Sequence, residues 1–213
     1  MLPTGRTHYE LINRPTLGFG VALPIPVAGR VNTNRPYVWV MTVDTADAFI
    51  TSLADLDVGW TCTESNELEE VLTTVAEPPV VGSPFPYEDL SMSGMDSLKV
   101  QLDPTLEDIR GANTGITRAA LGIADYGSVV LRSDETPTAE AASLFVDTHV
   151  AVLAASDIRP DMGAAVADLG PLLREENASA IIATGPSATA DMGSLVQGAH
   201  GPKTVHVVLL TDR

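Results

Sequence analysis

The sequence predicts an α/β protein with a mostly parallel sheet. Apolar runs of strand length alternate with segments in which apolar residues recur at helical spacing, a pattern typical of parallel strands joined by crossover helices. Turns rich in Gly, Pro, Ser and Asp separate these segments. With 213 residues the chain is long enough to bury one substantial core, and this length favours a single domain.

The first 35 residues are rich in Pro, Gly and Asn and show no sustained periodicity. We therefore expect an irregular N-terminal arm over residues 1–35 and one α/β domain over residues 36–213. The compact apolar run 37–43 predicts the first strand of this domain.

Two further strands and two helices are predicted in the first half of the domain. Asp44 can cap a helix that ends near residue 56, and residues 58–63 predict a strand. Acidic residues favour the first turn of a helix over 67–76, and the apolar pair 80–81 predicts a short strand.

The middle of the chain begins with residues 82–94, whose Pro, Ser, Gly and acidic residues predict a surface loop. Residues 98–102 predict a strand, and Asp103-Pro104 predicts a helix start, with Pro at the first helical position. The second half repeats the alternation: the predicted strands are 128–132, 149–153, 180–183 and 205–210, and the predicted helices are 161–169 and 190–197.

The chain is strongly acidic, with a formal net charge of −16 and only 12 basic residues, of which Lys99 and Lys203 are the two lysines. Such a surface repels nucleic acid and anionic lipid, so neither is an expected partner. The same composition suits a cytoplasm at molar salt, where the Debye length is about 3 Å and self-repulsion is screened. We therefore expect a halophilic or otherwise salt-adapted source; an ordinary solvated acidic coat is the alternative.

Cysteine content and hydropathy exclude several classes of protein. Cys62 is the only cysteine, so this chain cannot form an internal disulfide or by itself hold an iron–sulfur cluster, and its apolar context predicts a strand residue. The sequence has neither the roughly 18 consecutive apolar residues of a membrane span nor a secretory signal over residues 1–14. We expect a cytoplasmic protein without membrane insertion.

The segment Thr184-Gly-Pro-Ser-Ala-Thr-Ala-Asp191 lies between a predicted strand and a predicted helix. Gly185 permits close approach of the backbone to a ligand, Pro186 stiffens the loop, and Ser187 and Thr189 supply hydroxyl groups. Since the first amides of a helix lack internal partners, this arrangement favours a bound phosphate or carboxylate. The alternative is an ordinary turn capped by Thr189, with Asp191 complementing the helix dipole.

Two further segments carry polar side chains next to predicted strands. One is 113–117 with 124–128, in which Thr114, Gly115, Thr117, Asp125, Gly127 and Ser128 are candidate ligand-binding residues. Asp125 could accept a hydrogen bond from a ligand or bond its own backbone. The other is His200-Gly-Pro-Lys203, where Lys203 could pair with an anionic ligand or with a surface carboxylate.

Metal binding is not predicted. His149 and His206 begin two predicted strands, and no Cys, Glu or other His stands near them at metal-ligand spacing, so both are interpreted as structural. Ser187 lacks the context of a nucleophile elbow, which argues against a serine hydrolase.

Over about residues 112–210 the chain resembles the lactate-utilisation protein C family, which carries the LUD domain. The residues that carry the resemblance, in the family's order, are Gly115-Ile-Thr117 and the segments 123–131, 149–153, 184–191, 198–203 and 205–209. The resemblance implies a three-layer α/β/α fold similar to the NagB, ribose-5-phosphate isomerase and CoA-transferase group. It also implies a role in oxidising lactate to pyruvate beside separate iron–sulfur subunits.

Three positions depart from the family pattern. Tyr126 stands where the family has a small hydroxyl residue, and Ala188 stands where it has an arginine. The glutamate that the family has near Gly193 is absent from this chain. The chain therefore resembles a diverged member, and whether it keeps the family activity or is itself catalytic stays open.

The expected function is a non-redox subunit of a lactate-oxidising system, with no cofactor of its own and iron–sulfur clusters in its partners. The alternatives are a stand-alone enzyme or a binding module for a phosphorylated or CoA-linked small molecule, and self-association is left open. We expect the three polar segments to meet in one crevice that holds a small anionic ligand.

Overall fold

The computed structural model describes residues 43–85, 97–133, 138–175, 179–191, 193–194 and 196–213. These residues all belong to one compact unit, 39–213. The predicted arm 1–35 and most of the predicted loop 82–94 lie outside the described residues. So does the predicted strand 37–43, except for Val43, which begins a helix.

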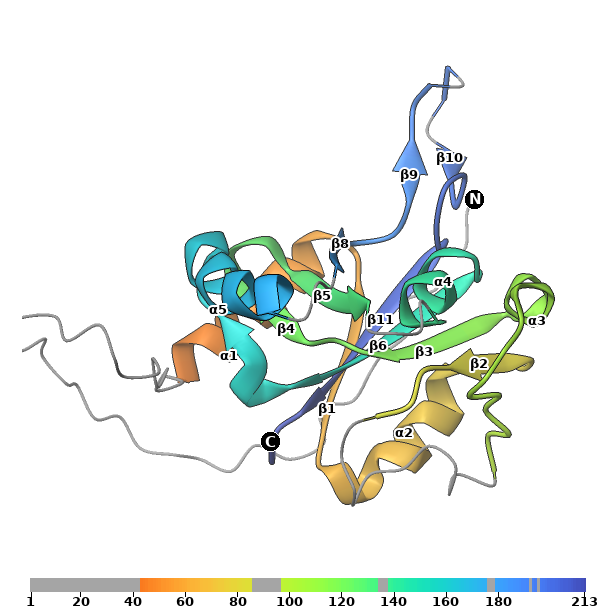
Figure 1. Cartoon of the computed structure of the whole chain (residues 1–213), viewed down its shortest axis with the longest axis horizontal. Helices are drawn as coiled ribbons and strands as arrows, with labels where there is room; N and C mark the ends of the chain where they lie inside the picture. The colour runs from red at the N-terminus through yellow and green to blue at the C-terminus, as the bar shows by residue number, and fades with distance from the viewer. Residues whose placement is uncertain (1–42, 86–96, 134–137, 176–178, 192, 195) are drawn as a thin grey trace, which may run out of the picture. The chain divides into compact units, whose positions relative to one another are not determined.

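A five-stranded sheet forms the centre of this unit (Figure 1). Every pair of neighbouring strands in it is parallel, and the order from edge to edge is β1 (Gly59–Thr63), β11 (Thr204–Leu210), β6 (Thr148–Ala154), β3 (Thr114–Arg118) and β2 (Val80–Gly82). Non-consecutive neighbours require crossover connections, as the alternating sequence pattern predicted. The mostly parallel α/β fold is confirmed.

Helices cover both faces of this sheet because its strands are apolar on both sides. On one face, α2 (Leu68–Val75), preceded by a 3-10 turn, buries Leu68 and Leu72 against alternate residues of β6 and β11. On the other face, α1 (Val43–Asp55) buries Phe49 and Leu53. The predicted helices 44–56 and 67–76 are thereby confirmed to within two residues.

The opposite end of the sheet is covered by α3 (Leu106–Gly111) and α4 (Thr138–Leu144), which pack together beside β2. A Cβ atom on Gly115 of β3 would lie 1.9 Å from the carbonyl oxygen of Ala142. Only glycine therefore allows α4 to approach β3 this closely, which gives Gly115 a packing role.

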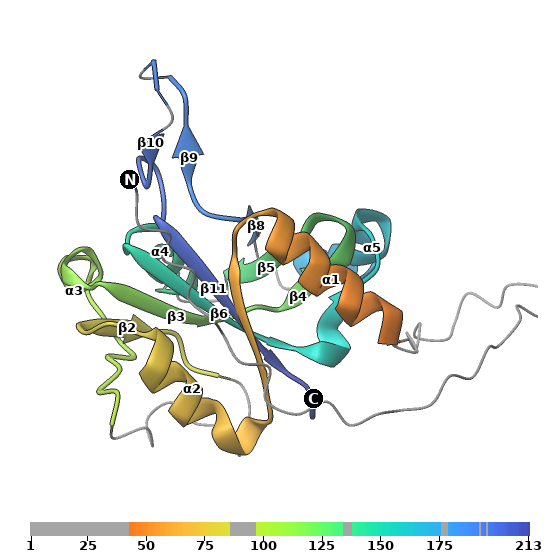
Figure 2. The same cartoon turned by 180° about the vertical axis from the view of Figure 1, so that it is seen from behind.

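A second, mixed sheet of four strands packs beside α1. Its order is β7 (Ile158–Arg159), β4 (Leu121–Ile123), β5 (Ser128–Ser133) and β8 (Ser179–Thr184), with β5 antiparallel to both neighbours. Figures 1 and 2 show α1 and α5 (Met162–Glu175) on opposite sides of this sheet. The predicted strand 180–183 is confirmed as β8, but it lies at an edge of this sheet with exposed side chains.

Two elements in the second half of the chain differ from their predictions. The predicted helix 161–169 forms and continues to Glu175 as α5, with Pro171 inside it. The predicted helix 190–197 is wrong: Ala188–Thr189 (β9) and Val196–Gln197 (β10) pair as an antiparallel hairpin that projects from the sheets in both views. Gly193 has φ +79, a left-handed conformation that a right-handed helix cannot contain.

In the middle of the chain one predicted strand is absent and one predicted helix begins later. Residues 98–102 form no strand, because Lys99 has φ +47 and breaks the extended conformation, and only Gln101 bridges to Val81 of β2. The helix predicted to start at Asp103-Pro104 forms as α3, but its first residue is Leu106, two positions after Pro104, and Thr105 caps it.

Candidate functional site

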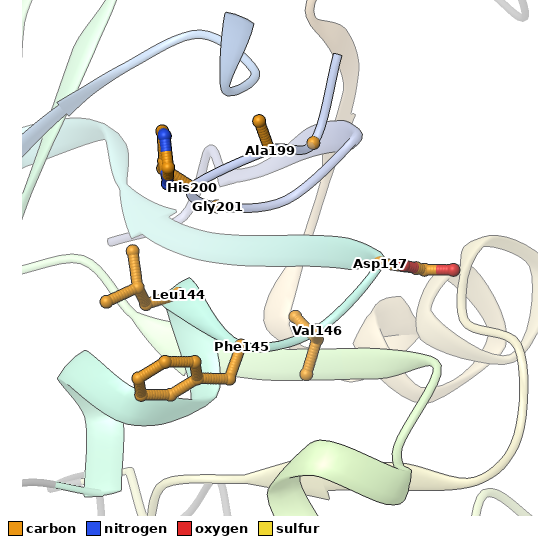
Figure 3. Close-up of a pocket in the computed structure, with 8 residues that line it drawn as sticks. Leu144, Phe145, Val146, Asp147, Ala199, His200 and Gly201 are labelled. Atoms are coloured by element: carbon orange, nitrogen blue, oxygen red, sulfur yellow. The ribbon is translucent and has the colours of Figure 1, made fainter. Parts of the chain in front are cut away.

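A cleft of about 440 Å³ opens at the amino-terminal ends of β6 and β11 (Figure 3). Residues 144–147, between α4 and β6, form one wall, and residues 198–201, which lead into β11, form the other. Its volume falls in the range of small-molecule sites. The cleft is the candidate functional site.

Backbone hydrogen bonds join the two walls. The amides of Lys203 and Thr204 donate to the carbonyl of Asp147, at 2.8 and 3.1 Å, which links the two strands where they begin. The cleft geometry is therefore set by rigid strand ends, which suits a preformed binding site.

Ser187 holds the 198–201 wall in place. Its amide donates a hydrogen bond to the carbonyl of Pro202 at 2.9 Å, and its carbonyl accepts one from the amide of Gly198 at 2.8 Å. Its hydroxyl accepts a third from the amide of His200 at 3.3 Å. Ser187 was predicted to bind the ligand, but in the structure its polar groups order the loop that forms the wall.

The cleft combines apolar and charged groups. Leu144 and Phe145 are 42% and 49% exposed, and Figure 3 shows them on the wall opposite His200, with the side chain of Asp147 pointing away from all three. Lys203 does not line the cleft: its Nζ lies 2.9 Å from the carboxylate of the lining residue Asp147, so of the two alternatives the structure shows the pair with a surface carboxylate. Both side chains are more than half exposed, so the pair contributes little to stability and could exchange for a ligand anion.

Three of the predicted site residues lie in the interior of the central sheet instead. The hydroxyl of Thr114 donates a hydrogen bond to the carbonyl of Glu77 and accepts one from the amide of Glu77. The hydroxyl of Thr117 lies 2.8 Å from Nε2 of His149. Thr114 and Thr117 are fully buried, and Gly115 contacts α4. These residues cannot touch a ligand in the cleft.

A second group lies against α1. The hydroxyls of Ser128 and Thr184 are 2.7 Å apart, which brings the 124–128 turn beside the 184–185 turn. Gly127, at φ +58, packs against the backbone of Ser52, so its conformation and its close contact both require glycine. Asp125 is exposed in the same turn.

The remaining predicted residues belong to the hairpin. Pro186 lies before β9, and the hydroxyl of Thr189 accepts a hydrogen bond from the amide of Asp191 at 3.3 Å. Because the predicted helix is a hairpin, the proposed binding of an anion at its N-terminus has no structural basis. The single crevice expected from three polar segments is divided among the core, the α1 side and the hairpin, and only His200 of the predicted residues lines the cleft.

The prediction missed the wall formed by residues 144–147. The apolar run Leu144-Phe-Val146 directly before a charged residue and a buried strand was the available signal, because apolar residues beyond a helix end suggest a surface with a role.

Cys62 and His206 lie outside the cleft, and each has a local structural environment. Desolvation, and then the nearby Asp47 carboxylate, raise the pKa of the Cys62 thiol, which lies in β1 as expected. Burial lowers the pKa of His206, whose Nε2 lies 2.9 Å from the hydroxyl of Thr61. Among the described residues, no three His, Cys, Asp or Glu side chains cluster as metal ligands, and no helix is long and apolar enough to cross a membrane.

The structure therefore defines an α/β protein with a parallel central sheet, a second mixed sheet and a cleft at the amino ends of two central strands. The LUD domain family matches residues 88–210, which include both walls of this cleft. The chain belongs to the LUD domain family.

Individual relatives agree with this assignment. The chain is 30% identical to "Lactate utilization protein C" of Anoxybacillus flavithermus over 71% of this chain and 73% of that protein. It is 34% identical to the protein of the same name from Bacillus subtilis, over 48% of this chain and 44% of that protein. The second alignment therefore spans less than half of that relative.

A solved structure shares the fold. The DUF162 family protein from Deinococcus radiodurans superposes with a TM-score of 0.62 at 20% identity, over 79% of this chain and 97% of that one. At this identity the likeness shows a common fold.

Proposed function

We propose that this chain takes part in lactate utilisation as a non-redox subunit that binds a small carboxylate and works beside separate iron–sulfur subunits. The names of the relatives support the process, and the single cysteine of this chain supports the proposal that separate subunits carry the clusters. The observation that supports this proposal most directly is that the residues matched by the LUD domain family include both walls of the cleft.

The chemistry of the cleft suits a short carboxylate. Leu144 and Phe145 offer an apolar surface for the carbon end of the ligand, and His200 on the opposite wall offers an N–H donor for the oxygen end. Lys203 does not line the cleft but is paired with the lining residue Asp147, and it offers a charged donor beside it. A ligand carboxylate would replace Asp147 as the partner of Lys203, at little cost because that pair is exposed.

Calorimetric titration tests the ligand, with lactate, pyruvate and inorganic phosphate as probes. We expect lactate or pyruvate to bind, and Lys203→Met to weaken binding about tenfold or more, since a hydrogen bond to a charged group contributes about 1.5–3 kcal/mol. Lys99→Met is the matched control, because it removes the other lysine from an exposed position outside the cleft. If the two variants bound the ligand with equal affinity, the cleft would not be the binding site.

Purification from the native host tests the partners. We expect cysteine-rich subunits to be recovered with the chain, together with iron and acid-labile sulfide in the recovered material. Recovery of the chain alone, with tight binding of phosphate or coenzyme A, would favour the alternative of a stand-alone enzyme or binding module.

A further inference from the structure

The loop formed by residues 198–202 supplies one wall of the cleft and curls around Ser187, which does not itself line the cleft. The amide of Gly198 donates a hydrogen bond to the carbonyl of Ser187 at 2.8 Å, and the amide of Ser187 donates one to the carbonyl of Pro202 at 2.9 Å. Both ends of the loop are therefore bonded to the backbone of one residue. These two bonds do not involve the Ser187 side chain, so a substitution there leaves them in place.

The middle of the loop depends on the side chain of Ser187. Its hydroxyl accepts a hydrogen bond from the amide of His200 at 3.3 Å. His200 is exposed, so burial does little to fix its position, and Figure 3 shows it on the wall opposite Leu144 and Phe145. The hydroxyl of Ser187 therefore supports the part of the loop that carries the imidazole.

Two glycines allow the loop to close this tightly around Ser187. Gly198 has φ +74, a backbone conformation that residues with side chains rarely adopt, and a Cβ atom there would collide with Cγ of Lys203. A Cβ atom on Gly201 would lie 3.0 Å from Cβ of Ser187, which is closer than ordinary van der Waals contact. The loop is therefore packed directly against the Ser187 side chain.

We infer that Ser187 is a positioning residue of the cleft: its hydroxyl sets the place of the His200 imidazole, and through His200 it sets the affinity for a carboxylate. The inference rests on the proposed function, in which His200 donates an N–H to the ligand. A donor that is held in place before binding loses less conformational entropy when the ligand arrives. Without the hydroxyl, ligand binding has to order the middle of the loop, and the affinity falls.

Thr189 offers a matched control for the Ser187 hydroxyl. Its own hydroxyl also accepts a hydrogen bond of 3.3 Å from a backbone amide, that of Asp191. This bond lies within the hairpin, two residues along the chain, and does not involve the wall of the cleft. Thr189→Ala should therefore leave ligand affinity unchanged, whereas direct contact of both hydroxyls with the ligand would make Thr189→Ala and Ser187→Ala equally harmful.

Calorimetric titration with lactate and pyruvate tests the inference in a double-mutant cycle. We expect Ser187→Ala to weaken binding about threefold to tenfold, the range of one neutral hydrogen bond. In a His200→Ala background the same substitution should have no further effect, because the hydroxyl acts through His200. Additive losses would mean that Ser187 contacts the ligand directly, and wild-type affinity in Ser187→Ala would mean that the hydroxyl has no role. Either result overturns the inference.

Amide exchange with solvent, measured by NMR, tests the same hydrogen bond without a ligand. Ser187→Ala should speed exchange of the His200 amide about threefold to tenfold and leave that of Gly198 unchanged, because the partner of Gly198 is a backbone carbonyl. Thr189→Ala should change neither. Equal exchange of His200 in wild type and Ser187→Ala overturns the inference. If wild type binds neither acid, the proposed function fails, and this measurement still decides whether Ser187 positions His200.

Discussion

At the scale of single residues, His149 shows how burial decides the role of a group that sequence identifies only as titratable. Its imidazole is fully buried, Nε2 lies 2.8 Å from the hydroxyl of Thr117, and burial lowers its pKa to about 4. At neutral pH the ring is therefore uncharged and satisfied by one hydroxyl. The interpretation of His149 as structural agrees with this environment.

This shift predicts a pH-dependent stability. The unfolded histidine titrates near pH 6.5 and the folded one near 4, so the unfolded chain binds the extra proton between these values. The contribution of His149 is full above about pH 6.5 and falls as the pH drops towards 4, by an amount of the order of 3 kcal/mol. Urea unfolding of wild type and His149→Gln across this range measures it.

The difference between the two curves isolates His149 from the many carboxylates of the chain. His200→Gln is the control, because His200 is exposed and we expect its curve to follow that of wild type. Parallel curves for wild type and His149→Gln would contradict the prediction.

At the scale of elements, local side-chain bonds fix where α3 begins. The hydroxyl of Thr105 accepts from the amide of Asp108 at 3.2 Å, and the Asp108 carboxylate accepts from the amide of Thr105 at 2.8 Å. The hydrogen bonds from Thr105, first from its side chain and then from its backbone, lower the pKa of Asp108. This reciprocal cap explains why the helix starts after Thr105 and not at Asp103-Pro104.

Removing the cap should therefore destabilise the protein. We expect Thr105→Ala to lower the free energy of unfolding by about 1 kcal/mol. Thr73→Ala on α2 is the matched control, because the Thr73 hydroxyl only donates to Glu69 one turn earlier, and its loss should be nearly neutral. Chemical denaturation measures both; equal effects would show that the cap does not stabilise α3.

At the scale of the whole molecule, the net charge of −16 acts on every conformation of the chain. Compaction brings the carboxylates closer, so repulsion opposes folding and salt relieves it. Adaptation to salt stays a prediction from composition, and the fold by itself does not test it.

The prediction can be checked by the salt dependence of stability. We expect the melting temperature to rise strongly between about 0.01 M salt, where the Debye length is about 30 Å, and about 1 M, where it is about 3 Å. Calorimetry in NaCl measures it, and glycerol serves as a control for a general solvent effect. Full stability in dilute buffer would count against adaptation to salt.

The sequence by itself determined the elements whose signals are local. Apolar runs and helical spacing located β1, β6, β8, β11, α1 and α2, because burial on a sheet or on one helix face imposes a fixed period. The same signals failed for residues 190–197, where helical spacing is overridden by the backbone conformation of Gly193. The strand predicted over residues 98–102 is absent for the same kind of reason, because Lys99 has a positive φ.

The tertiary structure alone decided which polar residues share a surface. Thr117 and His200 look equally available in sequence, yet one lies in the core beside His149 and the other lines the cleft. The second wall of that cleft, at Leu144 and Phe145, comes from a segment without any motif. Side-chain neighbours across a parallel sheet depend on strand order and register, which long crossovers set and which no local pattern encodes.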